Sequence, residues 1–403
     1  MPPPRTIAIS KTELIVILGV LTALAPLSID MYLPAFTALE EAFATDAGHV
    51  QLTLSSFFLA FAAGQLLYGP FSDRYGRRPV LYIGLLLYIA ASVGCIFAES
   101  IGTLIVLRFF EALGASAGVV VARAVVSDLY VAREAAGIYS AMMLVMGAAP
   151  MLAPLAGSYL MGRLGWDAIF GALALFGVLA LLLVRWRMPE TRGPNPKLSL
   201  AAGAIASRYS ALLKNRHFMG YTFAGGLAMS SLFAYIASSP FVFIDHYGIP
   251  AEHFGWVFGV NAAGFILFAQ FNARLLRSKT PLQIIGVAIV VQLAVSALLV
   301  LQSWMSGEFY AVAVPLFFQI ALLGFLVPNM TALGMAHFTT HAGVASAFMG
   351  SIQFLIAGMV SMGVSALHSD APGMLAAAMA ACTLSAFAVF RLVCRATGEA
   401  ARG

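Results

Sequence analysis

Twelve apolar stretches in this chain are each long enough to cross the ~30 Å hydrocarbon core of a membrane as a helix. Apolar residues make up 61% of the 403 residues and charged residues only 10%. A water-soluble domain of this length would need more polar surface than that composition supplies. The sequence therefore predicts an all-α membrane protein with twelve transmembrane helices, at 13–37, 50–71, 79–98, 101–123, 136–160, 166–186, 218–242, 254–275, 281–301, 309–333, 343–367 and 373–395.

The basic residues predict how these spans are oriented. A short loop between the second and third spans, within GPFSDRYGRRPVL at 69–81, carries four charges, and short basic loops stay on the cytoplasmic side. All but two of the 22 Lys and Arg residues fall at or beyond the cytoplasmic span ends in this arrangement, the exceptions being Arg163 and Arg108. We expect both termini to be cytoplasmic. The net charge of +5 then follows from topology and does not indicate a nucleic-acid partner.

Residues 187–217 form the only long polar stretch and divide the chain into two similar halves. The basic loop of the first half has a counterpart about 200 residues later, in Arg274, Arg277 and Lys279. We expect an N-terminal six-helix bundle (1–186), a cytoplasmic linker (187–217) and a C-terminal six-helix bundle (218–403). Duplicated bundles around a site at mid-membrane are a recurrent transporter design, in which one half rocks against the other.

Three charged residues fall well inside the predicted spans: Asp30, Arg108 and Glu111. Each would cost ~2.5–3.5 kcal/mol at a helix centre, so each is expected to face the protein interior or a water-filled cavity. Asp30 and Arg108 lie at similar depth and are able to pair, and Arg108 and Glu111 are three residues apart and share a face of the fourth span. A buried structural ion pair is one interpretation. Proton carriage is the other, because the proton affinity of a carboxylate changes with its access to water and to positive charge.

Prolines and glycines mark places where these helices bend or pack closely. Pro26 and Pro34 flank Asp30 by four residues on either side, which predicts a bend at this acid, either for ligand binding or for packing alone. In the fourth span, Gly114 and Gly118 allow a neighbouring helix to approach. The fifth span carries GAAPMLAPLAG at 147–157, a seam of small residues with two prolines that suits halves that open and close.

Several kinds of site are missing from the sequence. All seven histidines lie in loops or at span ends, which gives no support for a metal or haem site within the membrane. No phosphate-binding loop and no nucleophile elbow is present. We therefore expect no enzyme activity, no metal and no cofactor other than a coupling proton.

At this point the sequence resembles the major facilitator superfamily, and within it the Bcr/CflA-type drug:proton antiporters that include bicyclomycin- and chloramphenicol-resistance exporters. The resemblance covers nearly the whole chain, and GPFSDRYGRRPVL is its most specific match. The other similar segments are DMYLPAF at 30–36, RFFEALGAS at 108–116, SDLY at 127–130, APMLAPLAG at 149–157, VPNMTALGM at 327–335 and AGVASAFMGSIQ at 342–353.

The resemblance implies a role for each group of matching residues. Asp30 would be the cavity acid of the first helix, and Arg108 the buried arginine of the fourth. A cytoplasmic latch would comprise Gly69, Asp73, Arg74, Gly76, Arg77, Arg78 and Asp128. The antiporter seam would comprise Gly147, Pro150, Pro154 and Gly157. This chain departs from the family in two places: Glu111 replaces the usual glutamine and adds a titratable group, and Ala149 replaces a usual glycine in the seam.

From these features we expect a proton-driven antiporter of the bacterial inner membrane that exports small amphenicol- or bicyclomycin-like antibiotics by alternating access, as a monomer. Proton coupling would reside in the first half, with Asp30, Glu111 and Arg108. A proton-coupled transporter of a specific metabolite or nutrient is the alternative, and a membrane enzyme or sensor is an alternative of another class. The candidate substrate-binding residues are Asp30, Tyr32, Met142, Met146, Phe233, Tyr235, Asn261 and Gln319.

Overall fold

The computed structural model describes residues 9–130, 138, 142, 149, 152–196, 200, 203, 209–210, 212–305, 307–336, 342–366 and 371–394. Within these ranges every regular element is helical, and eleven helices are long and apolar enough to cross a membrane. The remaining predicted span, 136–160, falls mostly outside the described residues. The prediction of an all-helical membrane fold is confirmed.

The helices of the first half begin and end within a few residues of the predicted spans, apart from the first, which continues beyond residue 37, and the fourth, which continues beyond residue 123. Asp46 and Ser100 show why two of the helix starts are so well defined, since each side chain accepts a hydrogen bond from a backbone N–H of the first turn. The elements are α1 (Lys11–Asp30), the 3₁₀ turn η1 (Leu33–Ala35), α2 (Phe36–Phe43), α3 (Ala47–Tyr75), α4 (Arg77–Ile96), α5 (Ile101–Leu129) and α7 (Asp167–Trp186). Residues 152–164 are also helical.

The second half repeats this arrangement after the linker, and Asn215 caps its first helix by accepting from the N–H of Phe218. Its elements are α9 (Arg216–Pro240), the π-helix η2 (Phe241–His246), α10 (Ala251–Leu275), α11 (Pro281–Met305), α12 (Phe309–Ala321), α13 (Leu323–Met335), α14 (Ala342–Ser365), α15 (Pro372–Val389) and the π-helix η3 (Phe390–Cys394).

The first spanning segment is interrupted next to its acid. The α-helix α1 ends at Asp30, and the chain passes through the short turn η1, which contains Pro34, before α2 begins at Phe36. Proline has no N–H to donate, so the α-helical hydrogen bond to the carbonyl of Asp30 is missing. The predicted interruption at Asp30 is therefore present, and Asp30 is the last residue of a helix within the membrane.

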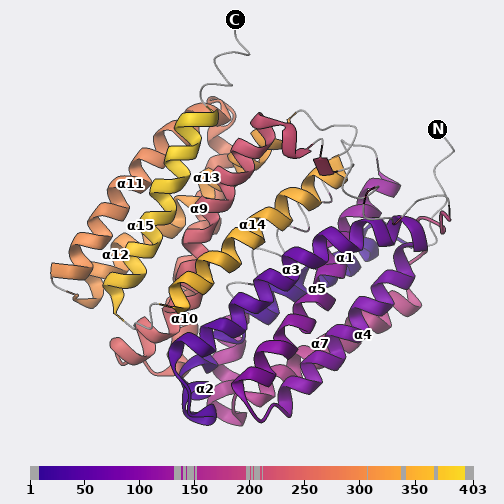
Figure 1. Cartoon of the computed structure of the whole chain (residues 1–403), viewed down its shortest axis with the longest axis horizontal. Coiled ribbons are helices and arrows are strands. Elements are labelled where there is room, and N and C mark those ends of the chain that lie inside the picture. The colour runs from indigo at the N-terminus through magenta and orange to yellow at the C-terminus, as the bar shows by residue number, and fades with distance from the viewer. Residues whose placement is uncertain are drawn as a thin grey trace, which may run out of the picture.

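The helices of the two halves occupy opposite sides of the molecule and meet along α3 and α14 (Figure 1). Two hydrogen bonds cross this contact: the Ser55 hydroxyl donates to the Ser361 hydroxyl over 2.8 Å, and the Ser351 hydroxyl donates to the Ala62 carbonyl over 2.7 Å. The first bundle is thus joined to the second along the length of one helix pair.

Two glycines of α5 allow close packing, but against different helices. A methyl group added at Gly114 would lie 2.5 Å from the backbone nitrogen of Tyr88 in α4, and one added at Gly118 would lie 2.5 Å from the carbonyl oxygen of Leu21 in α1. The glycine pair therefore lets α5 approach both neighbours, which brings α1, α4 and α5 together around the buried charges.

Candidate functional site

An ion pair lies completely buried in the first bundle. The Nη1 of Arg108 lies 2.7 Å from Oε2 of Glu111, and neither side chain is exposed. The two residues are one turn apart on α5, so the helix itself sets this geometry. Ser92 of α4 donates to the other carboxylate oxygen of Glu111 over 3.3 Å. Since an unpaired charge is very costly in a dry interior, each partner makes the burial of the other tolerable.

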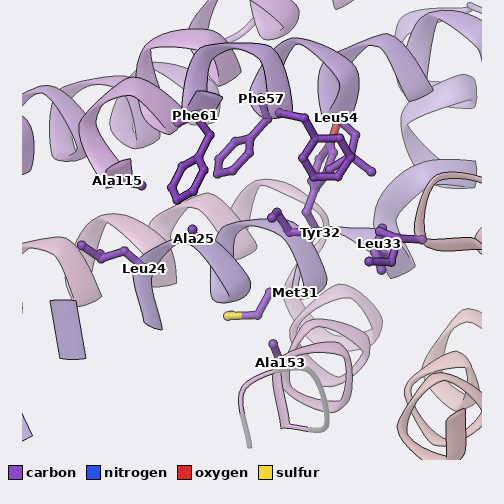
Figure 2. Packing of buried hydrophobic residues seen from close by; sticks show 14 of the residues in the cluster. Leu24, Ala25, Met31, Tyr32, Leu33, Leu54, Phe57, Phe61, Ala115 and Ala153 are labelled. Atoms are coloured by element: carbon purple, nitrogen blue, oxygen red, sulfur yellow. The ribbon is translucent and has the colours of Figure 1, made fainter. Parts of the chain in front are cut away.

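The guanidinium of Arg108 is also held from α1 and by aromatic rings. Its Nη2 donates to the carbonyl of Ser28 over 2.9 Å, while its Nε has no hydrogen-bond partner. The guanidinium carbon lies 4.6 Å from the ring centre of Tyr32 and 4.5 Å from that of Phe57, with Phe170 at 5.9 Å. Figure 2 shows Phe57 pointing from α3 toward the segment that carries Tyr32. Three elements thus form an aromatic cage around one cation.

Hydroxyl groups fix the side chains next to this cage. The Tyr32 hydroxyl lies 3.1 Å from the Thr53 hydroxyl, and the Ser28 hydroxyl lies 2.8 Å from that of Tyr88. These contacts connect α1 to α3 and to α4. Tyr32, expected to line a substrate cavity, is fully buried and lies against Arg108.

Asp30 lies at the broken end of α1 and is also buried, with 3% of its surface exposed. Among the described residues it forms no ion pair or hydrogen bond, so the pairing with Arg108 that the sequence allowed is not present; Arg108 binds Glu111 instead. The turn η1, which follows Asp30 closely, packs against α9 and α10 of the second bundle. Asp30 therefore lies where the two bundles meet, with its hydrogen-bonding capacity unused.

Two of the predicted second-half liners face this meeting point. Tyr235 stacks on Phe258 with ring centres 5.3 Å apart, and its hydroxyl accepts a hydrogen bond from Asn261 over 3.1 Å. Phe233 packs edge-on against Phe58 of the first bundle at 4.6 Å. Both belong to α9, which thus presents aromatic side chains to the first bundle.

Other predicted liners lie elsewhere. Gln319 is fully buried inside the second bundle, where Oε1 accepts from the Ser296 hydroxyl over 3.0 Å and Nε2 donates to the Thr383 hydroxyl over 2.8 Å. Both ends of its amide are thus engaged within the second bundle. Met142 is buried. Met146 lies outside the described residues.

The seam contacts both bundles. Gly157 packs against the backbone of Met31 just after the end of α1, and Figure 2 shows Met31 directed toward Ala153 of the same seam. On the other side, a methyl group added at Gly255 of α10 would lie 2.9 Å from the carbonyl carbon of Pro154. The N–H of Gly255 also donates to the Ser158 hydroxyl over 3.2 Å. Gly147 and Pro150 lie outside the described residues.

The predicted latch residues converge on Arg77, which is almost completely buried. Arg77 Nε donates to Asp128 over 2.8 Å, Nη2 donates to the other oxygen of Asp128 over 3.1 Å, and Nη1 donates to Asp73 over 2.9 Å. These bonds join the start of α4 to the ends of α3 and α5. The ion pairs of Arg77 therefore lie within the first half.

The linker completes the latch, which the sequence analysis did not predict. Glu190 accepts from the backbone N–H groups of Arg77 and Arg78, over 2.8 and 3.0 Å, and so caps the N-terminus of α4. Arg192 donates to Asp73 over 3.3 Å. Gly76 lies next to both linker residues and has a φ of 96°, a backbone conformation that is strained for a residue with a side chain. An added methyl group would also meet the carboxylate of Glu190.

The remaining latch residues have supporting contacts. The carbonyl of Arg74 accepts from the N–H of Asn195, and the side chain of Arg78 donates to the Tyr82 hydroxyl over 2.6 Å. Gly69 lies close to the hydroxyl of Tyr209. No group of three or more metal-binding side chains occurs among the residues described by the structure.

The comparisons with known proteins agree with this arrangement. The sequence profile of the Major Facilitator Superfamily matches residues 18–362. The chain is 31% identical to the uncharacterized MFS-type transporter YdgK of Bacillus subtilis, over 96% of this chain and 97% of that protein. It is 29% identical to the bicyclomycin resistance protein homolog of Haemophilus influenzae, over 94% of this chain and 96% of that protein. It is 35% identical to the chloramphenicol resistance protein of Pseudomonas aeruginosa, over 66% of this chain and 63% of that protein.

A solved structure shows the same fold. The D-xylose-proton symporter superposes with a TM-score of 0.77 at 13% identity, over 95% of this chain and 98% of that one. At this identity the likeness concerns the fold alone. Taken with the profile match across most of the chain, the helical architecture and the full-length relatives, it shows that the protein belongs to the major facilitator superfamily of membrane transporters.

Proposed function

We propose that this protein is a proton-driven multidrug antiporter, which exports small apolar or weakly polar antibiotics of the amphenicol or bicyclomycin type. The names of the bicyclomycin- and chloramphenicol-resistance relatives support the substrate class. The distribution of Lys and Arg supports an inner-membrane protein with both termini in the cytoplasm. The proton is the only coupling ion proposed, and the protein works as a monomer.

The observation that carries this proposal is the position of Asp30. A carboxylate that is buried at a helix break, forms no hydrogen bond with the described residues and adjoins a turn packed on the other bundle is well placed to exchange a proton as the bundles move. When the bundles separate, water reaches the carboxylate and favours its ionised form. When they close, burial favours the protonated form.

The ion pair beside it couples proton binding to the movement of α1. Arg108 holds the carbonyl of Ser28, two residues before Asp30, while its charge is balanced by Glu111. A proton that binds Glu111 removes this balance and leaves Arg108 free to attract Asp30. In this mechanism the two acids take turns as the partner of one arginine, and α1 follows the exchange.

The energy available from one proton is sufficient for modest resistance. One positive charge that moves inward gains ~2.3 kcal/mol per 100 mV of membrane potential. At ~1.4 kcal/mol per factor of ten, this holds a roughly fifty-fold gradient of a neutral drug. An exchange of one proton per drug molecule is therefore enough for export.

Proton release from inverted membrane vesicles tests the proposal. A pH-sensitive dye would follow the lumen as chloramphenicol, florfenicol or bicyclomycin is added to vesicles with wild-type protein, Asp30→Asn or Glu111→Gln. We expect drug-induced proton release by the wild type, and its loss in Asp30→Asn. Thr383→Val, in the polar network of the second bundle, is the matched control and should keep the response.

The outcomes separate the alternatives. Active export by Asp30→Asn against a gradient, equal to that of the wild type, would refute coupling through Asp30. Absence of any proton response to all three drugs in the wild type would favour a dedicated transporter of a metabolite.

A further inference from the structure

A groove of about 590 Å³ lies on the second bundle, apart from the buried charges of the first. It is formed by η2, the first turns of α10 and most of α12. Its lining is apolar and aromatic except for one amide and one phenol, and consists of Phe243, Trp256, Val257, Val260, Asn261, Phe309, Tyr310, Ala313, Val314, Phe317 and Phe318. A volume of this size accommodates a drug-sized molecule.

The groove opens toward the membrane. Trp256 is 66% exposed and Tyr310 is 78% exposed, although both belong to helices that cross the membrane. Trp and Tyr side chains near the ends of such helices are typical of the interface between lipid and water. The chain enters α9 at the end of the molecule that carries the latch, crosses to the opposite end and there begins α10 at Ala251. The lining residues of α10 follow this start, so they lie at the end opposite the latch. With the proposed orientation, the groove lies in the outer half of the bilayer.

The π-helix η2 shapes one wall of the groove. Pro240 ends α9 and is followed by the wider turn Phe241–His246, which places Phe243 in the lining. Phe243 then packs edge-on against Phe309 of α12, with ring centres 6.1 Å apart. Widened turns of this kind often occur at functional sites.

Asn261 gives the groove an unused hydrogen-bond acceptor. Its Nδ2 donates to the carbonyl of Val257 and to the hydroxyl of Tyr235, each over 3.1 Å. The carbonyl of Val257 accepts only, so this contact fixes which end of the amide is nitrogen. The remaining atom, Oδ1, is buried and has no hydrogen-bond partner in the part of the chain that the structure describes, and Asn261 is 5% exposed. A buried carbonyl in this state favours a ligand that donates a hydrogen bond.

The floor of the groove is connected to the central acid. Asn261 of α10 bonds to Tyr235 of α9, and both helices pack against η1, the turn that follows Asp30. The floor of the groove thus adjoins the place where the two bundles meet. This continuity favours a transported molecule over a resident membrane lipid as the occupant.

We propose that this groove binds substrate in the outer half of the membrane, and that it takes an apolar molecule whose hydroxyl or amide N–H donates to Oδ1 of Asn261. The inference rests on the proposed export function and adds a lateral position through which a lipophilic substrate leaves the protein. It involves no covalent step and no proton transfer.

Quenching of Trp256 fluorescence tests the groove directly. The full-length protein in lipid nanodiscs, without a proton gradient, would be titrated with a terminally brominated long-chain alcohol and with the bromoalkane of the same length. Probe concentrations are expressed per lipid, so that partitioning does not affect the comparison. The signal of Trp256 is the difference between wild type and Trp256→Phe. We expect the alcohol to quench at about three- to tenfold lower concentration, as for one neutral hydrogen bond.

Two variants assign this preference to Asn261. Asn261→Leu should remove the difference between alcohol and alkane. Asn272→Leu, on the same helix but outside the groove, should keep it; its amide is already engaged by Asn329 over 2.6 Å. Equal quenching by the two probes in the wild type would overturn the proposal, and this measurement needs no variant. A preference that persists in Asn261→Leu would overturn it as well.

Competition identifies the occupant. Chloramphenicol should displace the bromoalcohol from the wild type. Displacement by an increased share of phosphatidylglycerol in the nanodisc, with no effect of chloramphenicol, would show a lipid site and overturn the assignment to substrate. Because binding is measured without proton flux, a lack of drug-induced proton release would refute the antiport mechanism and leave the groove result standing.

Discussion

The Nη2 of Arg108 donates to the backbone carbonyl of Ser28 over 2.9 Å, and so joins the charged centre of α5 to the last turn of α1. Two residues later α1 ends at Asp30. Because this bond reaches the backbone, a displacement of Arg108 acts on the position of α1 and not on one side chain alone.

The buried ion pair is expected to behave as a unit. Arg108→Met should lower the free energy of unfolding by about 3–5 kcal/mol, because it leaves Glu111 as an unpaired buried charge. The double variant Arg108→Met with Glu111→Leu should recover most of this loss, yet should not transport. Unfolding of the purified protein in detergent measures the three stabilities. A double variant as unstable as the single one would show that charge burial is not the cause.

The aromatic cage is expected to contribute to holding Arg108. Phe57→Leu removes a ring whose centre lies 4.5 Å from the guanidinium, whereas Phe61→Leu changes the next ring on the same face of α3. Phe61→Leu serves as the reference for the loss of a buried ring, so the difference between the two variants estimates the cation–ring contact, expected at about 0.5–2 kcal/mol. The same unfolding assay measures it, and equal losses in the two variants would speak against a role for the cage.

The contact between α10 and the seam is expected to depend on the absence of a side chain at Gly255. A methyl group there would lie 2.8 Å from the Cα of Leu155, on backbone that cannot give way easily. Gly255→Ala should therefore reduce drug transport about tenfold or more while the protein still inserts in the membrane. Gly286→Ala in α11 is the control, since nothing lies within 4 Å of the added methyl group. Transport in inverted vesicles compares them, and similar activity of both would contradict the prediction.

The linker is expected to be held by Glu190. Glu190→Ala removes two charge-assisted hydrogen bonds to the first backbone N–H groups of α4, so trypsin should cut faster at the exposed Arg192. Cleavage should occur in inverted vesicles and not in right-side-out vesicles, because the linker is proposed to be cytoplasmic. Glu308→Ala, at the opposite end of the molecule, should leave the cleavage rate unchanged. Cleavage from the outside would reverse the proposed orientation.

Most of the fold could be predicted from hydropathy, because long apolar runs contrast strongly with the short polar loops between them. The break after Asp30 was also predictable, since Pro34 has no N–H to donate. The partner of Arg108 could not be derived from depth alone, because Asp30 and Glu111 both lie within reach along the membrane normal. Glu111 is the partner because it lies one helical turn from Arg108 on α5.

Contacts between elements that are distant in the sequence could not be predicted from it. The cage around Arg108 draws Tyr32, Phe57 and Phe170 from three segments, and aromatic residues are frequent in every span. Gln319 resembles a cavity residue in sequence, yet its hydrogen bonds to Ser296 and Thr383 lie inside the second bundle. Glu190 is the single acidic residue of the linker, yet nothing in the sequence places it beside the start of α4, where it accepts from two backbone N–H groups.

The cage of ring faces around Arg108 has a consequence for movement within the membrane. A ring face attracts a cation without fixing the direction of its N–H groups, unlike a carboxylate, which does fix it. In the proposed exchange of partners, the guanidinium would turn from one acid toward the other while the ring faces keep its charge stabilised. Such a turn would need no water at this buried position.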